Sequence, residues 1–141
     1  MNAPMNGSTI RIIQALSGVA IAAAGSSNAV NLAAYEKAML IVSVGSAPTA
    51  AGGGLLVSVQ RSGTSNGTFQ PFGASLPAMG ANAKVATRSF AVNTSAVWHK
   101  VFYDNGTGGS TISNIELLAH NPRYEPVTTQ ESNVTVYSDV L

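Results

Sequence analysis

From residue 37 onward, short apolar runs alternate with segments rich in turn-forming residues, which is the pattern of an all-β protein. Residues 55–61 alternate most clearly, placing Val57 and Val59 on one face of a half-buried strand. Residues 37–45 form a longer apolar run dense in β-branched side chains, typical of a strand buried on both faces. The other expected strands are residues 10–16, 19–22, 30–34, 68–72, 87–93, 98–103 and 111–119.

The segments between these runs predict turns and loops. Glycine is concentrated in residues 46–54 and 104–110, and we interpret the second segment as a hairpin turn whose Asn and Gly residues adopt positive φ. Residues 73–86 are weakly patterned and are expected to form a long loop, with or without a helical turn. About eight short strands without an amphipathic helix predict a single-domain β-sandwich or jelly roll. An up-and-down barrel stays open, because spacing does not fix strand order.

We expect three regions in the chain. Residues 1–36 pack on or extend from the domain, residues 37–119 form the sandwich core, and residues 120–141 form an extended C-terminal arm with a terminal strand. Prolines near the start of the arm hold the backbone extended and remove hydrogen-bond donors. The arm either contacts another subunit or packs on its own domain as an edge strand. The residues expected to contact a subunit or a capsid are Pro122, Arg123, Tyr124, Glu125, Pro126, Val136 and Tyr137.

Composition adds a statement about the surface. Charged residues make up 9% of the chain, against about 25% in ordinary soluble domains. A charge-poor surface promotes association, so the sequence favours a subunit that neighbours largely cover. The basic residues are scattered rather than clustered, which argues against a nucleic-acid partner. The chain has no cysteine, which excludes disulfides and thiolate metal sites.

One N-terminal segment imitates a signal peptide. Arg11 precedes an apolar run that ends in small residues, but Gln14 and Ser17 interrupt the run. The run is also shorter than the about 20 apolar residues that a transmembrane helix needs. We therefore expect a strand here and no membrane partner, while secretion stays open.

No arrangement of residues in the sequence indicates catalysis. The histidines, His99 and His120, form no short-range metal pair, and no nucleophile motif of the form G-x-S-x-G occurs. No two carboxylates are spaced as a matched acid and base. We expect a protein that is not an enzyme and has no catalytic residues, cofactor or metal. The large aromatic residues of the middle strands are interpreted as core; they are Phe69, Phe72, Phe90, Trp98 and Tyr103.

The order of these features resembles a family of phage proteins. The run AMLIVSVGSAPTAAGGGLLVSVQRSGTSNGTFQPF places an apolar strand and a Gly-rich loop before a strand ending in V-Q-x-S, then a Gly-Thr turn and an aromatic. The run SFAVNTSAVWHKVFYDNGTGGSTISNIELLAHNPRYEPV continues the pattern. Over roughly residues 37–128 the chain is similar to jelly-roll head decoration (cement) proteins of tailed bacteriophages.

The resemblance implies a structural virion protein on the exterior of a phage head, made in the cytoplasm of the bacterial host. It would bind the major capsid protein, associate with itself as a homotrimer, and bridge neighbouring capsomers to stabilise the shell. Two alternatives stay open. One is another phage structural component, such as a tail or head-fibre protein, and the other is a secreted lectin-like β-sandwich.

Overall fold

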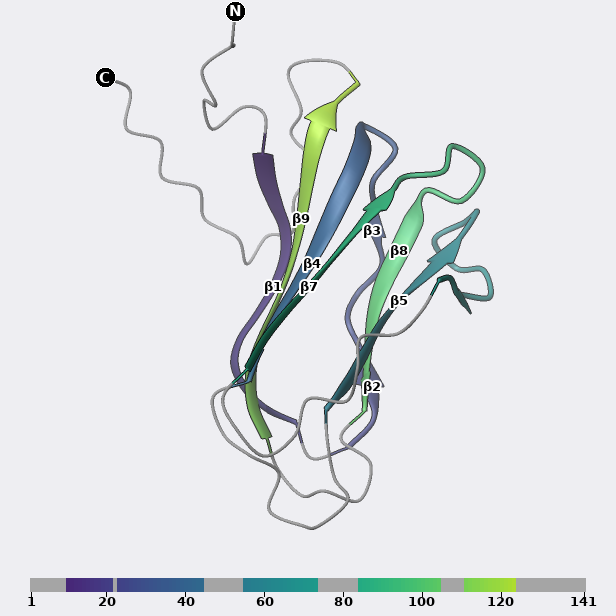
Figure 1. Ribbon diagram of the computed structural model, residues 1–141. Helices are drawn as coiled ribbons and strands as arrows, with labels where there is room; N and C mark the ends of the chain where they lie inside the picture. Colours follow the sequence, from purple (N-terminus) through teal and green to yellow (C-terminus); the bar gives the residue numbers. More distant parts are fainter. Residues whose placement is uncertain (1–9, 22, 45–54, 74–83, 105–110, 124–141) are drawn as a thin grey trace, which may run out of the picture.

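The computed structural model describes residues 10–21, 23–44, 55–73, 84–104 and 111–123, and these residues form a β-sandwich (Figure 1). Within these ranges the chain forms strands and turns, and no helix. The strands are β1 (Ile10–Ile21), β2 (Gly25–Ser26), β3 (Val30–Asn31), β4 (Tyr35–Val44), β5 (Leu56–Ser62), β6 (Gln70–Pro71), β7 (Lys84–Ala91), β8 (Trp98–Asp104) and β9 (Thr111–Pro122). The expectation of an all-β sandwich is confirmed.

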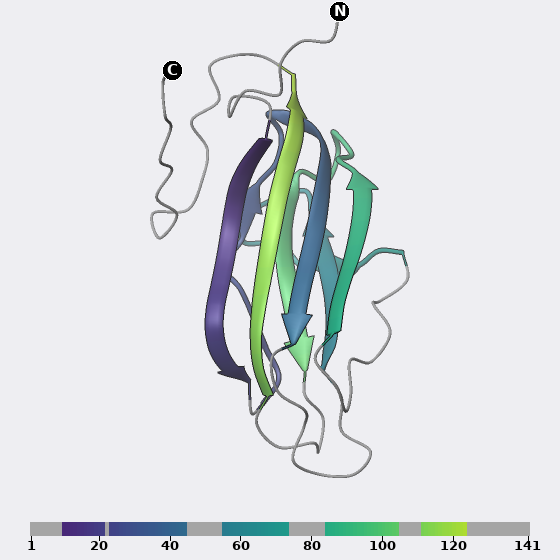
Figure 2. The ribbon, with the colours of Figure 1, turned by 60° about the vertical axis from the view of Figure 1, so that its left-hand side comes forward.

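One layer is a sheet with the strand order β1-β9-β4-β7, which we call the β4 sheet (Figure 2). All its strand pairs are antiparallel. Its edge strand β1 pairs with β9 along its whole length, apart from register shifts between Ile12 and Gln14 and between Leu16 and Val19. Such bulges bend and twist a strand, and they make a long edge a poor template for unwanted pairing.

The other layer, the β8 sheet, has the order β2-β8-β5-β6, with β3 also paired to β8. Two short strands, β2 and β3, thus occupy one side of β8, while β5 runs along the other side. If β2 and β3 are counted as one interrupted strand, the two sheets have the strand order of a jelly roll. The consecutive strands β7, β8 and β9 therefore alternate between the sheets.

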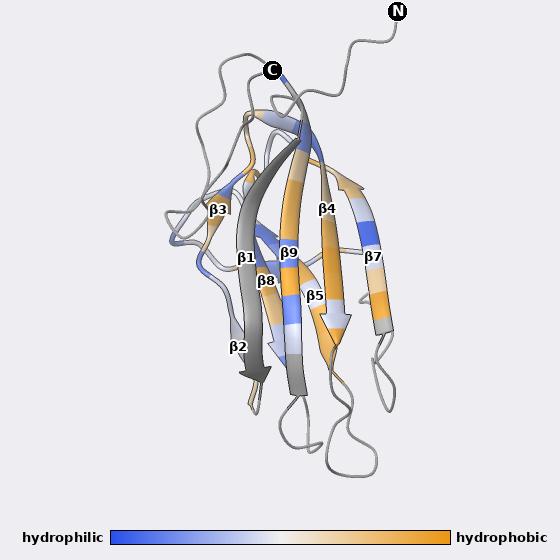
Figure 3. Cartoon of the chain, turned by 90° about the vertical axis from the view of Figure 1, so that its left-hand side faces the viewer, coloured by the Kyte–Doolittle hydropathy of each residue, from blue (hydrophilic) through white to orange (hydrophobic). Residues whose placement is uncertain are grey.

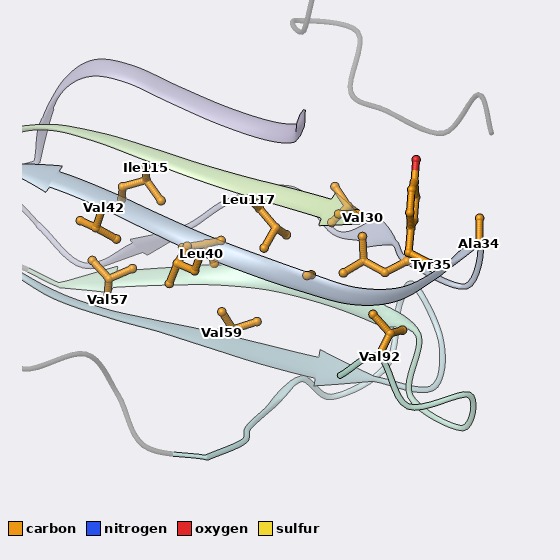
Figure 4. Close-up of a cluster of buried hydrophobic side chains, with 14 of the residues drawn as sticks. Val30, Ala34, Tyr35, Leu40, Val42, Val57, Val59, Val92, Ile115 and Leu117 are labelled. Atoms are coloured by element: carbon orange, nitrogen blue, oxygen red, sulfur yellow. The ribbon is translucent and has the colours of Figure 1, made fainter. Parts of the chain in front are cut away.

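The core lies between the two sheets and comes from alternate residues of facing strands (Figure 4). Leu40 and Val42 of β4 and Leu117 of β9 are 0% exposed, and Val57 and Val59 of β5 lie opposite them at 1%. Fully burying a side chain of this kind contributes about 1.5–3 kcal/mol. The alternation predicted for residues 55–61 is therefore confirmed.

Two expectations about strands need correction. The run 37–45 is not buried on both faces, because Met39, Ile41 and Ser43 are only half-buried on the outer side of the β4 sheet. The expected loop 73–86 is wrong at its end, since β7 begins at Lys84 and pairs there with Val44 of β4. Residues 74–83 of that loop lie outside the described residues.

The hairpin expected at residues 104–110 is also incorrect as a connection. Its flanking strands β8 and β9 belong to different sheets, so they are not hydrogen-bonded neighbours of a hairpin. The sheets begin at Ile10 and end at Pro122, so they extend beyond the core expected at 37–119. The arm expected beyond residue 123 lies outside the described residues.

Candidate functional site

Of the residues expected to form an interface, the structure describes Pro122 and Arg123. Pro122 is the last residue of β9 and is paired in register with Tyr35 of β4. The other expected interface residues lie outside the described residues; they are Tyr124, Glu125, Pro126, Val136 and Tyr137.

Arg123 is bonded to its own domain. Its backbone N–H donates to the carbonyl of Ala34 at 2.7 Å. Its side chain donates from Nε to the carbonyl of Tyr35 at 3.0 Å, and from Nη2 to the carbonyl of Val92 at 3.2 Å. Arg123 therefore ties the end of β9 to the start of β4 and the end of β7.

The strands β7, β4 and β9 lie side by side in the β4 sheet and build its outer face together (Figure 3). Paired residues of antiparallel strands lie on the same face, so the register defines this surface in rows across β7, β4 and β9. Met39 lies between Ser89 and Leu118, and Ile41 lies between Thr87 and Glu116. The remaining rows are Ala91, Lys37 and His120, and Val85, Ser43 and Asn114. We call these twelve residues the outer β4 face.

This face has three apolar residues at its centre, Met39, Ile41 and Leu118. Met39, Ile41 and Leu118 are half-buried, and Val85 is 69% exposed. Of its twelve residues, Lys37 and Glu116 carry a formal charge at neutral pH. Apolar side chains gathered at the centre of a face, with polar residues around them, are the arrangement found in protein–protein interfaces.

The outer face of the β8 sheet has a different character, because aromatic residues lie on it. Trp98 and Phe102 of β8 are half-buried there, paired with Ser62 and Ser58 of β5. Lys100, between them on the same strand, places its Nζ 4.5 Å from the ring centroid of Phe69. The interpretation of Trp98 as a core residue is therefore wrong. His99 and Val101 of β8 point into the core, so Trp98, which alternates with them, lies on the outer face.

Phe72, Phe90 and Tyr103 do pack against the core, as expected from the sequence. Gly25 of β2 lies so close to Tyr103 that a Cβ there would be 2.7 Å from the ring. A glycine at this position therefore leaves room for the ring of its cross-strand neighbour.

A cluster of aromatic rings and cationic side chains lies where the edge strand β6 of the β8 sheet faces the edge strand β7 of the β4 sheet. The Phe72 ring is edge-on to Phe90 at 5.2 Å and to His99 at 5.7 Å, and Phe90 stacks on His99 at 5.4 Å. The Arg61 guanidinium lies 4.7 Å from the Phe72 centroid, and that of Arg88 lies 5.8 Å away. Arg88 Nη2 also donates to the carbonyl of Phe72 at 3.2 Å.

His99 is the titratable group of this cluster. The residue is 1% exposed, and its Nδ1 lies 2.9 Å from the carbonyl of Val97. Burial lowers the pKa of His99 below its ordinary value of 6.5; the Val97 hydrogen bond opposes this and the positive charge of Arg61 adds to it. The ring is therefore a neutral part of the packing.

Among residues 10–21, 23–44, 55–73, 84–104 and 111–123, no group of three or more His, Asp or Glu is placed to hold a metal ion. In the described part of the chain, no helix has the length and apolar character needed to span a membrane.

The outer β4 face was not expected from the sequence. In the run 37–45, both the odd-numbered and the even-numbered positions carry apolar residues, which is the pattern that this face leaves in the sequence. The strand order was needed to show that one of the two sets points outward. No protein-family model matches the chain, and no curated protein matches it in sequence. The class of protein that the structure itself defines is a single β-sandwich with jelly-roll strand order.

Proposed function

We propose that this chain is a structural virion protein, a decoration or cement subunit that binds the outside of a bacteriophage head. In this role it contacts the major capsid protein, associates with itself as a homotrimer, and bridges neighbouring capsomers. The observation that carries the proposal is the outer β4 face, whose apolar centre and few charges suit contact with another protein.

The strand order gives supporting, but not selective, information. Jelly-roll sandwiches occur in viral capsid proteins, in lectins and in cupins, so fold does not decide among these functions. The low charge of the whole chain and its resemblance to phage decoration proteins favour the first of them. A subunit of this kind works by contact, since many modest contacts repeated around a symmetric shell add through multivalency.

A binding experiment with phage heads that lack this protein tests the proposal. Expanded heads of the phage that encodes the chain, prepared without it, are mixed with the purified protein and sedimented. We expect saturable binding of the wild-type chain. A protein that leaves the heads undecorated at micromolar concentration would refute the decoration role.

Matched substitutions on the outer faces of the two sheets test whether the outer β4 face is the one that binds the phage head. Ile41→Glu and Val85→Glu place a carboxylate on the outer β4 face, and Leu56→Glu places one on the other sheet, where Leu56 is 44% exposed. Loss of about 2 kcal/mol at an interface centre corresponds to about 30-fold weaker binding. We expect this loss for Ile41→Glu and unchanged binding for Leu56→Glu, with folding of each variant checked by circular dichroism.

The position on the virion separates a head subunit from a tail or head-fibre component. Gold particles attached through the C-terminus should label the head surface in electron micrographs. Labels confined to the tail would assign the chain to the tail instead.

The outward aromatic residues of the β8 sheet favour one alternative function. Trp98 and Phe102, with Lys100 between them, lie half-buried on this outer face, and sugar-binding surfaces combine aromatic rings with polar groups in this way. A lectin-like role would appear as hits in a glycan screen that are lost in Trp98→Ala. An empty screen would remove this candidate.

A further inference from the structure

Contacts between rings close the sandwich at the side where β6 faces β7. Phe72 follows β6 in the β8 sheet, whereas Phe90 belongs to β7 in the β4 sheet, and their rings meet edge-on. His99 of β8 lies against both rings, stacked on Phe90 with 27° between the ring planes. The His99 ring therefore joins the two sheets.

The hydrogen bonding of His99 fits the neutral ring. Nδ1 lies within hydrogen-bond distance of the Val97 carbonyl, which can only accept, so Nδ1 carries the proton. Nε2 is buried and has no hydrogen-bond partner among the described residues. A second proton on Nε2 would create a buried N–H donor without an acceptor there, which is costly.

The charges around His99 also disfavour protonation of its ring. Arg61 of β5 is its cross-strand partner, and both Arg61 and Arg88 of β7 lie against the Phe72 ring that contacts His99. The carboxylates of the described residues lie elsewhere: Glu36 is exposed at the start of β4, Asp104 ends β8, and Glu116 is on the outer β4 face. An imidazolium at this place would be a third positive charge.

We propose that His99 is a pH-sensitive latch: its neutral ring holds the β6 and β7 side of the sandwich closed, and its protonation opens that side. The opening separates Phe72 from Phe90 and breaks the bond from Arg88 to the Phe72 carbonyl. The pairing of β1 with β9, at the opposite edge of the β4 sheet, stays intact.

The direction with pH follows from linkage. Burial lowers the pKa of His99, so an opened state, whose ring is solvated, binds the proton more readily than the closed state. The closed state is fully favoured above pH 6.5, the ordinary value, and is lost as pH falls through the lowered pKa. One proton changes the opening equilibrium by up to about tenfold per pH unit in this window.

Hydrogen exchange measured by mass spectrometry, corrected for intrinsic rates, tests the latch in the full chain. Between pH 7.5 and pH 5 we expect protection to fall in peptides covering residues 68–73 and 84–92, and to persist in peptides from β1 and β9. His99→Gln, whose amide has no proton to gain, should make exchange in these peptides independent of pH. His120→Asn, on the outer β4 face, is the control and should leave the pH dependence unchanged.

A second measurement keeps the test decisive if His99→Gln does not fold. The Cε1–H resonance of His99 is followed by NMR in the wild-type chain. A midpoint at or above pH 6.5, or equal protection of the two regions at both pH values, would overturn the proposal. A lowered midpoint that coincides with loss of protection in residues 68–73 and 84–92 would support it.

Discussion

The hydrogen bonds of Arg123 offer the sharpest test of how the end of β9 is held against the start of β4 and the end of β7. Its side chain makes two hydrogen bonds from a charged donor, to the carbonyls of Tyr35 and Val92 at 3.0 and 3.2 Å. Buried bonds of this kind contribute about 1.5–3 kcal/mol each, but Arg123 is exposed and water competes for its donors. We therefore expect Arg123→Ala to cost about 1–2 kcal/mol of unfolding free energy.

Lysine at this position separates charge from geometry. A guanidinium spans two carbonyls with fixed donors, whereas an ammonium is a single point on a flexible stem. Arg123→Lys should therefore recover less than half of the loss, although it keeps the charge. Lys37→Ala, at an exposed position on the outer β4 face, is the control and should change stability by less than about 0.5 kcal/mol.

Urea unfolding followed by fluorescence gives these free energies, since Trp98 is the one tryptophan of the chain and is half-buried. The midpoints are compared at a common m-value, because a changed slope would indicate an altered unfolded or native state. The reasoning is refuted if Arg123→Ala shifts the free energy by less than about 0.3 kcal/mol, or if Arg123→Lys is as stable as the wild type.

Two further substitutions test the packing by the same urea assay. Leu40→Ala, at a position that is 0% exposed, should cost about 2–5 kcal/mol, and Met39→Ala, the outward neighbour on β4, should cost less than half as much; equal costs would contradict the assignment of the two faces. Gly73→Ala should cost at least about 1–2 kcal/mol, because Gly73 has a φ of 63° and a Cβ there would meet Nη2 of Arg88. A neutral result would mean that the turn and Arg88 adjust without loss.

Strands with regular alternation could be found from the sequence alone. The segment 98–103 corresponds to β8 (Trp98–Asp104) and 111–119 to β9 (Thr111–Pro122), because alternation is a local property of an extended chain. The start of β7 at Lys84 was missed, since pairing with β4 supplies what its weak local pattern lacks. The connection between β8 and β9 was misread because turn residues do not reveal which sheet the next strand joins.

The features of the candidate sites depend either on the local sequence or on the arrangement of the whole fold. The segment 98–103 has large apolar residues of both parities, so the sequence led to Trp98 as the core residue, whereas the structure buries its neighbour His99. The acceptors of Arg123 come from Tyr35 and Val92, far away in the chain, and no local pattern indicates them. The outward direction of Met39 and Ile41 depends on which face of the β4 sheet meets the β8 sheet, which is a property of the whole fold.

The position of β9 between β1 and β4 has a consequence for synthesis of the chain. The first of these strands to leave the ribosome pairs along its length with the last, so β1 has no partner until residue 122 has emerged. The β4 sheet therefore stays incomplete until β9 has been synthesised, and its long-range pairing predicts slow folding. Until then, β1 and β4 each carry an open strand edge that chaperones or sister chains can reach.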